Sequence, residues 1–339
     1  MKRIAVIGGG SWGTALGIVA ARAGHDVRLW SRNEEVVQSI NGQHVNSVYL
    51  TGFPIPTELR ATSEVSEALD QRELVILAVP SHAIRGVLQS MALVVEPGMV
   101  FISATKGIEI ETGRRISQIV SEVVGKRFSP SFVCLSGPSF AKEVVARHPT
   151  AIVAASKSDE LSRSVQSTLS FENLRIYTND DVVGTEVAGS AKNVMAIAAG
   201  IVAGLGFGSN SVAALITRGL AEITRLALKE GAKLETLMGL AGLGDLVLTC
   251  TGSLSRNRFV GQELGKGRSL DEITRGMKEV AEGVKTTRAL KHLSKQLGVE
   301  MPITEEVNAV LYEGKTAREA AANLMTRPLR DEVQRKSFV

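Results

Sequence analysis

Residues 3–13 read RIAVIGGGSWG and are the strongest indication of the fold in the sequence. Its first five residues form an apolar run that predicts a strand, and residues 12–22 have a helical pattern. Gly8 permits a tight turn, Gly10 lets a pyrophosphate approach the backbone closely, and Gly13 lets helix and strand pack together. The helix N-terminus then offers N–H groups and partial positive charge to phosphates. The stretch therefore predicts a dinucleotide-binding turn that opens a β-α-β unit.

The rest of the first half alternates short apolar runs with helical patterns. The predicted strands are residues 3–7, 26–30, 74–79, 99–103, 132–135, 151–155 and 174–177. Apolar strands without alternation, separated by helices, are typical of a parallel sheet covered on both faces. We expect an α/β fold with a Rossmann-like, doubly wound, mainly parallel sheet.

The character of the sequence changes near Asn179, whose neighbours Asp180 and Asp181 complete a good helix N-cap cluster. Beyond it the apolar periodicity is helical almost to the end. The predicted helices include residues 212–230, 234–240, 255–264, 270–277, 286–297, 304–312 and 317–324. We expect two domains, an α/β domain over residues 1–180 and an all-α domain over residues 181–339.

Composition restricts the class of partner. The formal net charge of +4 comes without a long basic run or an aromatic–basic stripe, which argues against nucleic acid. The two cysteines, Cys134 and Cys250, make neither a disulfide framework nor a metal-ligand pair. None of the five histidines stands in a suggestive constellation. We expect a cytoplasmic protein without a bound metal.

Two uncharged runs imitate membrane signals. Residues 4–21 follow Lys2 and Arg3, as in a signal peptide, but their glycines do not suit an apolar signal helix. Residues 193–217 are long enough to span a membrane, but a polar, glycine-rich cluster divides them. We expect a buried helix followed by a loop at the second run, and no membrane span.

The end of the second predicted strand bears on cofactor choice. NAD sites usually place an Asp or Glu there to bind the ribose 2′-OH. This chain has Ser31, Arg32 and Asn33 instead, and Arg32 suits a 2′-phosphate. The alternative is that Arg32 is a solvated loop cation. We expect NADPH to be preferred, with NADH left open.

The carboxyl edge of the sheet is where open α/β folds bind ligands. Three predicted strands end there in Pro80-Ser81, in Ala104-Thr105-Lys106-Gly107, and in Ser136-Gly137-Pro138-Ser139. Topology thus brings Lys106 to the cofactor edge, although a surface lysine after a strand is an equally ordinary interpretation. His82 follows the first of these turns, and we interpret it as a structural residue or as one that supports the site residues.

Lys192 is the strongest catalytic candidate. Glu186 and Lys192 are the only charged residues between positions 182 and 217, and six residues separate them, so they do not share a helix face. A lysine in so apolar a helix is buried or lines a cavity, and burial lowers its pKa toward neutrality, where it exchanges protons readily. The alternative is a lysine at the domain rim with its head in water.

Three further segments carry polar groups. Asp245 follows Gly242-Leu243-Gly244 in what reads as a glycine-flanked loop, where it caps a turn or pairs with a buried cation. Ser255, Arg256 and Asn257 offer a hydroxyl, a guanidinium and an amide, which suit a phosphate, although an N-capped solvated helix start has the same composition. The stretch 280–283 reads as a polar turn and is weak evidence by itself.

Several of these motifs recur in one order in a known family. They are the glycine turn at 8–13, the segments 104–107, 136–141, 191–193, 219–222, 241–246 and 255–257, and residues 301–304. Over residues 3–325 the chain resembles bacterial NAD(P)-dependent sn-glycerol-3-phosphate dehydrogenases. The resemblance implies a dimeric cytoplasmic enzyme that supplies glycerol 3-phosphate for phospholipid synthesis, with residues 181–339 binding substrate and forming the dimer.

The resemblance also implies roles for single residues. Lys192 matches the proton donor and acceptor, and Lys106 and Asp245 match residues that hold the substrate and tune this lysine. The matching substrate contacts are Lys106, Gly137, Ser139, Lys192, Asp245, Thr249, Ser255, Arg256 and Asn257. The matching cofactor contacts are Gly8, Gly10, Ser11, Trp12, Gly13, Arg32, Lys106, Ala141, Arg256, Val280 and Glu282.

The implied reaction is hydride transfer from NAD(P)H to C2 of dihydroxyacetone phosphate, with a proton from Lys192. One alternative is a two-domain β-hydroxyacid dehydrogenase, which also carries a lysine followed by an asparagine on its long helix. Residues 255–257 argue against it. The other alternative is a sensor that binds NAD(P)H without turnover, for which Lys106, Lys192 and Asp245 would have no use.

Overall fold

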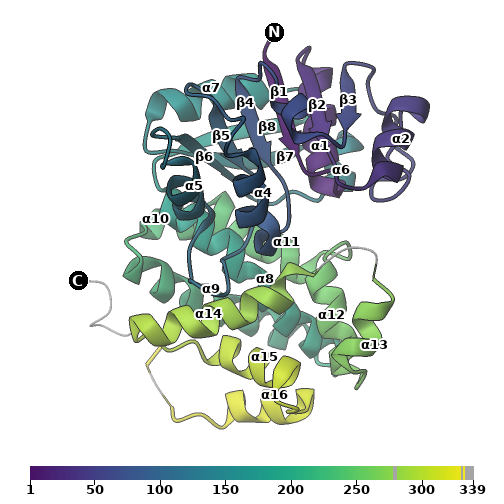
Figure 1. The fold of residues 1–339 in the computed structure, drawn as a ribbon. Coiled ribbons are helices and arrows are strands. Elements are labelled where there is room, and N and C mark those ends of the chain that lie inside the picture. The colour runs from purple at the N-terminus through teal and green to yellow at the C-terminus, as the bar shows by residue number, and fades with distance from the viewer. Residues whose placement is uncertain (278–280, 330, 333–339) are drawn as a thin grey trace.

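The computed structural model describes residues 1–277, 281–329 and 331–332. Figure 1 shows a sheet-bearing N-terminal part packed against a C-terminal part made of helices. The strands are β1 Arg3–Ile7, β2 Asp26–Trp30, β3 Leu59–Thr62, β4 Leu74–Leu77, β5 Val100–Ser103, β6 Ser131–Ser136, β7 Thr150–Ala155 and β8 Leu174–Asn179.

These strands form one sheet of eight in the order β3-β2-β1-β4-β5-β6-β7-β8. Every neighbouring pair is parallel except β6 with β7. The predicted fold class, a Rossmann-like and mainly parallel doubly wound sheet followed by helices, is confirmed. The helices of this part are α1 Ser11–Arg22, α2 Glu34–Gln43, α3 Val65–Leu69, η1 Ser81–Ala83, α4 Ile84–Met91, α5 Ile116–Val124, α6 Ala141–Val145 and α7 Asp159–Leu169.

The sheet is buried on both faces because alternate side chains of each strand enter different cores. Ile4 and Val6 of β1 pack into one apolar cluster with α1 and α2, whereas Ala5 and Ile7 pack into another with α4 and α5. This explains the continuous apolar strands, since neither face meets water.

The edge strand β3 is absent from the strands expected from the sequence. It is four residues long and pairs only with β2, in the register Val27↔Leu59. Its sequence, LRAT, contains a charged residue and only two apolar ones. It therefore lacks the continuous apolar run by which the other strands were predicted.

The C-terminal part surrounds α8, which is almost completely buried. Its helices are α8 Val182–Gly204, α9 Ser209–Lys229, α10 Leu234–Met238, η2 Leu240–Gly244, α11 Asp245–Thr251, α12 Arg256–Gly265, α13 Leu270–Arg275, α14 Glu282–Leu297, α15 Pro302–Tyr312 and α16 Ala317–Met325. By length and composition α8 is apolar enough to cross a membrane, but 83% of its most apolar window is buried inside the protein, as in a core helix. The loop expected after it is only residues 205–208, because the polar cluster at 209–211 starts α9.

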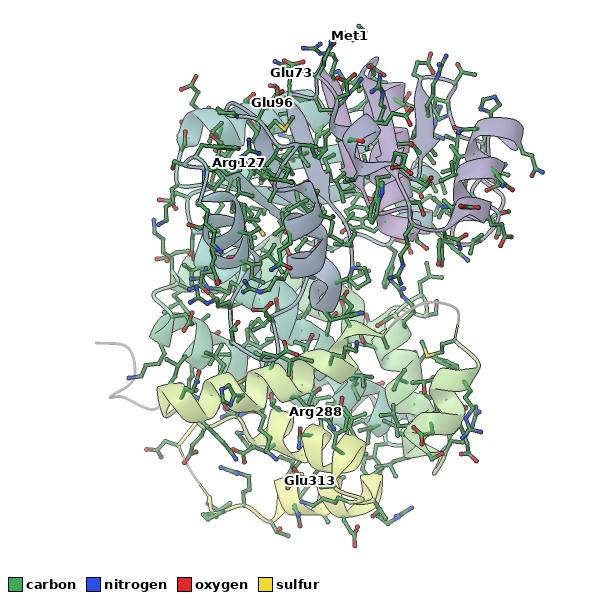
Figure 2. All side chains as sticks on the ribbon, in the orientation of Figure 1. Met1, Glu73, Glu96, Arg127, Arg288 and Glu313 are labelled. Atoms are coloured by element: carbon green, nitrogen blue, oxygen red, sulfur yellow. The ribbon has the colours of Figure 1, made fainter. Side chains whose placement is uncertain are left out.

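The orientation of the sheet determines which strand ends meet the helical part. Figure 2 places Met1 and Glu73, which precede β1 and β4, at the far end of the molecule from Arg288 and Glu313. The amino edge of the parallel strands therefore faces away from the helical part. The carboxyl edge, where the predicted site residues of the sheet lie, faces it.

Candidate active site

The glycine turn after β1 has the geometry that a dinucleotide requires. Gly8 has a φ of +131°, and a Cβ there would lie 2.5 Å from the carbonyl oxygen of Ala78. A Cβ on Gly13 would lie 2.0 Å from the carbonyl oxygen of Gly8, whereas one on Gly10 would meet no heavy atom within 4 Å. No side chain caps the N-terminus of α1, which begins directly after Gly10. The turn thus combines open space with a helix N-terminus, and it fits a pyrophosphate.

Three buried polar atoms near this edge have no hydrogen-bond partner in the described part of the chain: Trp12 Nε1, Ser136 Oγ and Glu282 Oε2. Buried polar groups are nearly always paired, so each such atom suggests a partner that arrives from outside the chain. Trp12 and Glu282 are predicted cofactor contacts. These atoms therefore fit a bound nucleotide and substrate better than a closed apolar core.

Asp245 joins the two predicted catalytic lysines. Its Oδ1 lies 2.8 Å from Lys192 Nζ, and its Oδ2 lies 2.7 Å from Lys106 Nζ. Lys106 also donates to the carbonyl oxygen of Gly137 at 3.1 Å, and Lys192 donates to Thr249 Oγ1 at 2.8 Å. Lys192 is 7% exposed and Asp245 is 1% exposed. Two ammonium groups thus share one buried carboxylate between the carboxyl edge of the sheet, α8 and α11.

The environment lowers the pKa values of both Lys192 and Asp245, for different reasons. Burial lowers the pKa of Lys192 to about 8; the charge of Asp245 opposes the shift and the charge of Lys106 adds to it. Burial by itself would raise the pKa of Asp245, but the ammonium groups of Lys106 and Lys192 outweigh it and hold that pKa below its ordinary value. The cluster is therefore an ionised aspartate beside a lysine that titrates near physiological pH.

The segment before Asp245 is helical and not the loop expected from its glycines. Residues Leu240–Gly244 form a π-helical turn, and Asp245 is the first residue of α11. Gly242 permits this turn, because a Cβ there would lie 2.1 Å from the carbonyl oxygen of Leu237. Asp245 points to the two lysines, so the interpretation as a partner for a buried cation describes its position better than the capping alternative.

The segment after β6 lies beside the lysines. Gly137 has a φ of +134°, and a Cβ there would lie 2.9 Å from the Cα of Ile152. The carbonyl oxygen of Gly137 accepts hydrogen bonds from both Lys106 Nζ and Ser139 Oγ. Ala141 starts α6 immediately afterwards. The structure thus brings this predicted substrate segment into direct contact with Lys106.

Residues 255–257 start α12, and two of their side chains are engaged within the protein. Ser255 Oγ accepts the backbone N–H of Arg258, which is the N-cap that the sequence left as an alternative. The side chain of Asn257 donates to Asn193 Oδ1 at 3.0 Å and accepts from the N–H of Gly283 at 2.8 Å. The exposed Arg256 lies close enough to Glu282 for its charge to lower the pKa of that carboxyl.

Glu282 connects the start of α14 to η1, which follows β4. Its Oε1 accepts the N–H of Ser81 at 3.2 Å. Burial raises the pKa of Glu282 to about 7, against the opposing effects of the Ser81 N–H and the charge of Arg256. The sequence indicated the Pro80-Ser81 turn only as a strand end, and its contact with Glu282 follows from the packing of the two parts.

The remaining predicted cofactor contacts lie further along the edge. Ser11 Oγ donates to the carbonyl oxygen of Tyr49 at 2.6 Å. Arg32 is exposed after β2. Burial lowers the pKa of His82, and the charges of Lys285 and Arg32 lower it further. Val280 lies outside the described residues.

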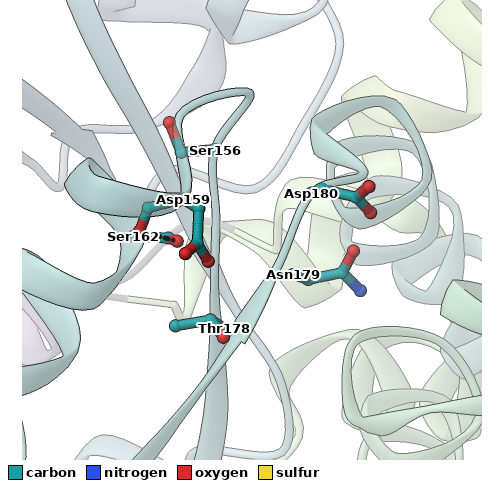
Figure 3. Close-up of a pocket in the computed structure, with 6 residues that line it drawn as sticks. All are labelled: Ser156, Asp159, Ser162, Thr178, Asn179 and Asp180. Atoms are coloured by element: carbon teal, nitrogen blue, oxygen red, sulfur yellow. Dashed lines mark hydrogen bonds between the residues drawn. The ribbon is translucent and has the colours of Figure 1, made fainter.

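A separate pocket lies beside the strand that leads into α8. Figure 3 shows its lining by Ser156, Asp159, Ser162, Thr178, Asn179 and Asp180. Its two carboxylates already pair with cations, Asp159 with Arg163 and Asp180 with Lys233. It contains none of the lysine–aspartate cluster. Among the described residues, no group of three or more His, Cys, Asp and Glu side chains is arranged to hold a metal ion.

Comparisons with known proteins agree over almost the whole chain. Residues 3–162 match the family model for the NAD-dependent glycerol-3-phosphate dehydrogenase N-terminus, and residues 181–322 match the model for the C-terminus. The chain belongs to the NAD-dependent glycerol-3-phosphate dehydrogenase family. The family predicted from the sequence is confirmed.

Relatives of this dehydrogenase family support the same assignment. The glycerol-3-phosphate dehydrogenase [NAD(P)+] of Koribacter versatilis is 54% identical over 335 residues, which cover 98% of this chain and 99% of the relative. That of Geobacter sulfurreducens is 49% identical, with 98% and 99% covered. A crystal structure of glycerol-3-phosphate dehydrogenase from Coxiella burnetii superposes with a TM-score of 0.93 at 40% identity, covering 96% of this chain and 99% of that one.

Proposed function

We propose that this protein interconverts dihydroxyacetone phosphate and sn-glycerol 3-phosphate with NAD(P)H. The observation that carries the proposal is the buried Lys192, held 2.8 Å from an aspartate that also pairs with Lys106, at the sheet edge that carries the glycine turn. The names of the full-length relatives support the same substrate and cofactor. Neither a β-hydroxyacid substrate nor a sensor without turnover receives support from these relatives.

The chain's residues have complementary tasks in this reaction. When bound, NAD(P)H supplies the hydride that reaches C2 of the ketone. Lys192 gives its proton to the C2 oxygen as negative charge develops there, and Lys106 adds positive potential at the same oxygen. Asp245 keeps both ammonium groups in place. In the oxidising direction, neutral Lys192 takes the hydroxyl proton back.

Other residues hold the remaining atoms of the substrate. Arg256 binds the phosphate with Ser255 and Asn257, so binding energy remote from C2 orients the carbonyl. Gly137, Ser139 and Thr249 provide the nearby hydrogen-bonding groups.

The cofactor occupies the glycine turn and the edge beside it. In the proposal it contacts Gly8, Gly10, Ser11, Trp12, Gly13, Arg32, Lys106, Ala141, Arg256 and Glu282. Arg32 favours NADPH by pairing with its 2′-phosphate. Arg32→Ala should lower the ratio of kcat/KM for NADPH to that for NADH, and an unchanged ratio removes Arg32 from cofactor selection.

The two parts of the chain divide this work in the proposal. Residues 1–180 bind the nucleotide, and residues 181–339 bind the substrate and form a homodimer in the cytoplasm. Sedimentation of the purified protein tests the dimer, since a species of one chain mass at all concentrations contradicts it. The product supplies phospholipid synthesis.

The decisive experiment follows NADPH absorbance with dihydroxyacetone phosphate. Wild type should turn over, and Lys192→Ala should bind NADPH normally but lose about 10²- to 10⁴-fold in kcat, the usual effect of removing a general acid. Lys229→Ala, an exposed lysine of α9, is the control and should match wild type. Normal turnover by Lys192→Ala removes its assigned role, and equal turnover of 3-hydroxyisobutyrate and glycerol 3-phosphate contradicts the substrate.

A further inference from the structure

The segment between β5 and α5, residues 104–115, crosses from the sheet to the helical part, and we call it the strap. Figure 1 shows it descending from the sheet toward α8 and α9. Its third residue is Lys106, which pairs with Asp245 of α11. Ile108 is 2% exposed and belongs to the apolar core of the helical part. The strap is therefore anchored in both parts of the molecule.

The far end of the strap carries a buried ionic cluster on α8. Arg115 Nη1 donates to Glu186 Oε2 at 2.8 Å. Glu186 also accepts the backbone N–H of Ser117 at 2.7 Å and the hydroxyl of Ser117 at 2.6 Å. The side chains of Arg115 and Glu186 are 11% and 3% exposed. Glu230, at the end of α9, lies 3.4 Å from Arg115 Nε and makes a second contact with the helical part.

Residues 105 and 109 of the strap form hydrogen bonds with the sheet-bearing part. Arg85 of α4 forms two hydrogen bonds of 2.7 Å with the two carboxylate oxygens of Glu109. Thr105 Oγ1 donates to the carbonyl oxygen of Val79 at 2.8 Å. Ile108 and Arg115 pair as an isolated antiparallel bridge, which closes the strap on itself. These contacts fix the strap to the sheet-bearing part, as Arg115 fixes it to the helical part.

The chemistry of the Arg115–Glu186 pair favours a geometric role over a stabilising one. Removing two charges from water costs about as much as their attraction returns, so buried ion pairs contribute little net stability. Their directional hydrogen bonds do fix the position of the helix that carries them. Glu186 lies six residues before Lys192, about 9 Å along α8 at 1.5 Å per residue.

We propose that Arg115 and Glu186 are positioning residues that hold α8 against the strap so that Lys192 and Lys106 both reach Asp245. The inference rests on the proposed function, because it assigns the pair an effect on proton transfer. Neither residue contacts Lys192, and both act through α8 and the strap. A shift of about 1 Å at the reacting groups is enough to reduce turnover about 10²-fold.

The test compares Glu186→Gln with a change at another ion pair, whose arginine is equally buried but whose carboxylate is more exposed. Gln keeps the size of Glu186 and one acceptor for Ser117, but it loses the charge that holds Arg115. The control is Asp26→Asn, which removes the carboxylate 2.6 Å from the buried Arg72 at the amino edge of the sheet. For each variant kcat, KM for dihydroxyacetone phosphate, the Kd for NADPH and Tm are measured. Arg115→Met and Arg115→Lys complete the set.

Glu186→Gln should lose about 10- to 100-fold in kcat while its Kd for NADPH stays at the wild-type value, since the glycine turn is untouched. Asp26→Asn should keep the kcat of wild type even if its Tm falls by as much as that of Glu186→Gln. Arg115→Lys, which keeps the charge, should recover part of the kcat that Arg115→Met loses. An unchanged kcat in Glu186→Gln, or an equal loss in Asp26→Asn at equal Tm, overturns the proposal.

A crystal structure of Glu186→Gln gives a readout independent of turnover. The proposal expects the Lys192 Nζ–Asp245 Oδ1 contact, 2.8 Å in wild type, to be broken or lengthened. An intact contact overturns it. If wild type itself fails to reduce dihydroxyacetone phosphate, the proposed function fails, and the crystallographic result still decides whether the pair positions α8.

Discussion

At the scale of single residues, the protein places ionisable groups where water cannot reach them. Near the carboxyl edge Lys192 is buried and Glu282 is half-buried with its Oε2 shielded from water, and loss of water moves their pKa values toward neutrality from opposite sides, to about 8 and about 7. Each group therefore changes charge near neutral pH, and each shift has a measurable consequence.

The first prediction concerns the pH dependence of kcat/KM, which reports ionisation in the free enzyme. Reduction needs the ammonium form of Lys192, so kcat/KM for dihydroxyacetone phosphate should fall as pH rises through about 8. Oxidation needs the neutral amine, so kcat/KM for glycerol 3-phosphate should rise through the same range. Profiles that change in the same direction for both reactions would contradict the assignment.

The second prediction concerns stability. The folded-state pKa of Glu282, about 7, lies above its ordinary value of 4.5. Between these values the folded state holds a proton that the unfolded state has released, so stability falls as pH rises across this window. Glu282→Gln removes the penalty, and its Tm should exceed that of wild type above pH 7 and match it near pH 4.5.

The exposed Glu96, labelled in Figure 2, supplies the control: Glu96→Gln should leave the pH dependence of Tm unchanged. The same Glu282→Gln variant should bind NADPH more weakly if this carboxylate contacts the cofactor. A Tm difference from wild type that does not vary with pH would rule out the buried charge as its cause.

At the scale of elements, a glycine seam lets α8 and α12 approach closely. A Cβ on Gly200 would lie 2.0 Å from the carbonyl oxygen of Arg258, and one on Gly261 would lie 1.9 Å from that of Ile197. A Cβ on Gly204 would lie 2.2 Å from the carbonyl oxygen of Gln262. The seam brings the start of α12, with Arg256, beside the helix that carries Lys192.

The third prediction follows from this seam. Gly261→Ala forces a methyl group against backbone atoms and should destabilise the protein by about 1–3 kcal/mol. Gly86→Ala in α4 is the control, because a Cβ there meets no heavy atom within 4 Å. It should stabilise by about 0.5–1 kcal/mol through helix propensity. Urea denaturation measures both, and equal effects would show that the seam is not closely packed.

At the scale of the whole molecule, the two parts are connected by more than the chain itself. The strap enters the helical core through Ile108, and a small apolar cluster joins Cys134 and Val153 of the sheet to Val182 and Ala241. Ion pairs between the parts include Lys106–Asp245 and Arg115–Glu186. We infer that the sheet-bearing part depends on the helical part for stability.

The fourth prediction tests this dependence with a fragment of residues 1–180. Without the helical part, Ile108 loses its burial and Lys106 loses its carboxylate partner. The fragment should unfold at a lower urea concentration than the full chain, as followed by circular dichroism. A fragment with the same midpoint would show that the two parts fold independently, and it would favour a domain boundary at residue 180.

Much of this protein could be predicted from local sequence. The parallel sheet and the glycine turn follow from apolar runs and residue spacing, and the helical second half follows from periodicity. The motifs also led to the family, and fold class and family are both confirmed. The strand β3 was missed because LRAT has no continuous apolar run. The segment before Asp245 was wrongly expected to be a loop, because its glycines form a π-helical turn.

Tertiary structure alone decided how the side chains meet. The pairs Lys106–Asp245, Arg115–Glu186 and Lys192–Thr249 join positions 139, 71 and 57 residues apart. No local pattern encodes such contacts, because they depend on how α8, α11 and the strap pack against the sheet. Local sequence specified which residue types are present and which elements carry them. The burial of Lys192, which lowers its pKa, and the surroundings that leave Glu282 Oε2 without a hydrogen-bond partner arise only when the whole chain has folded.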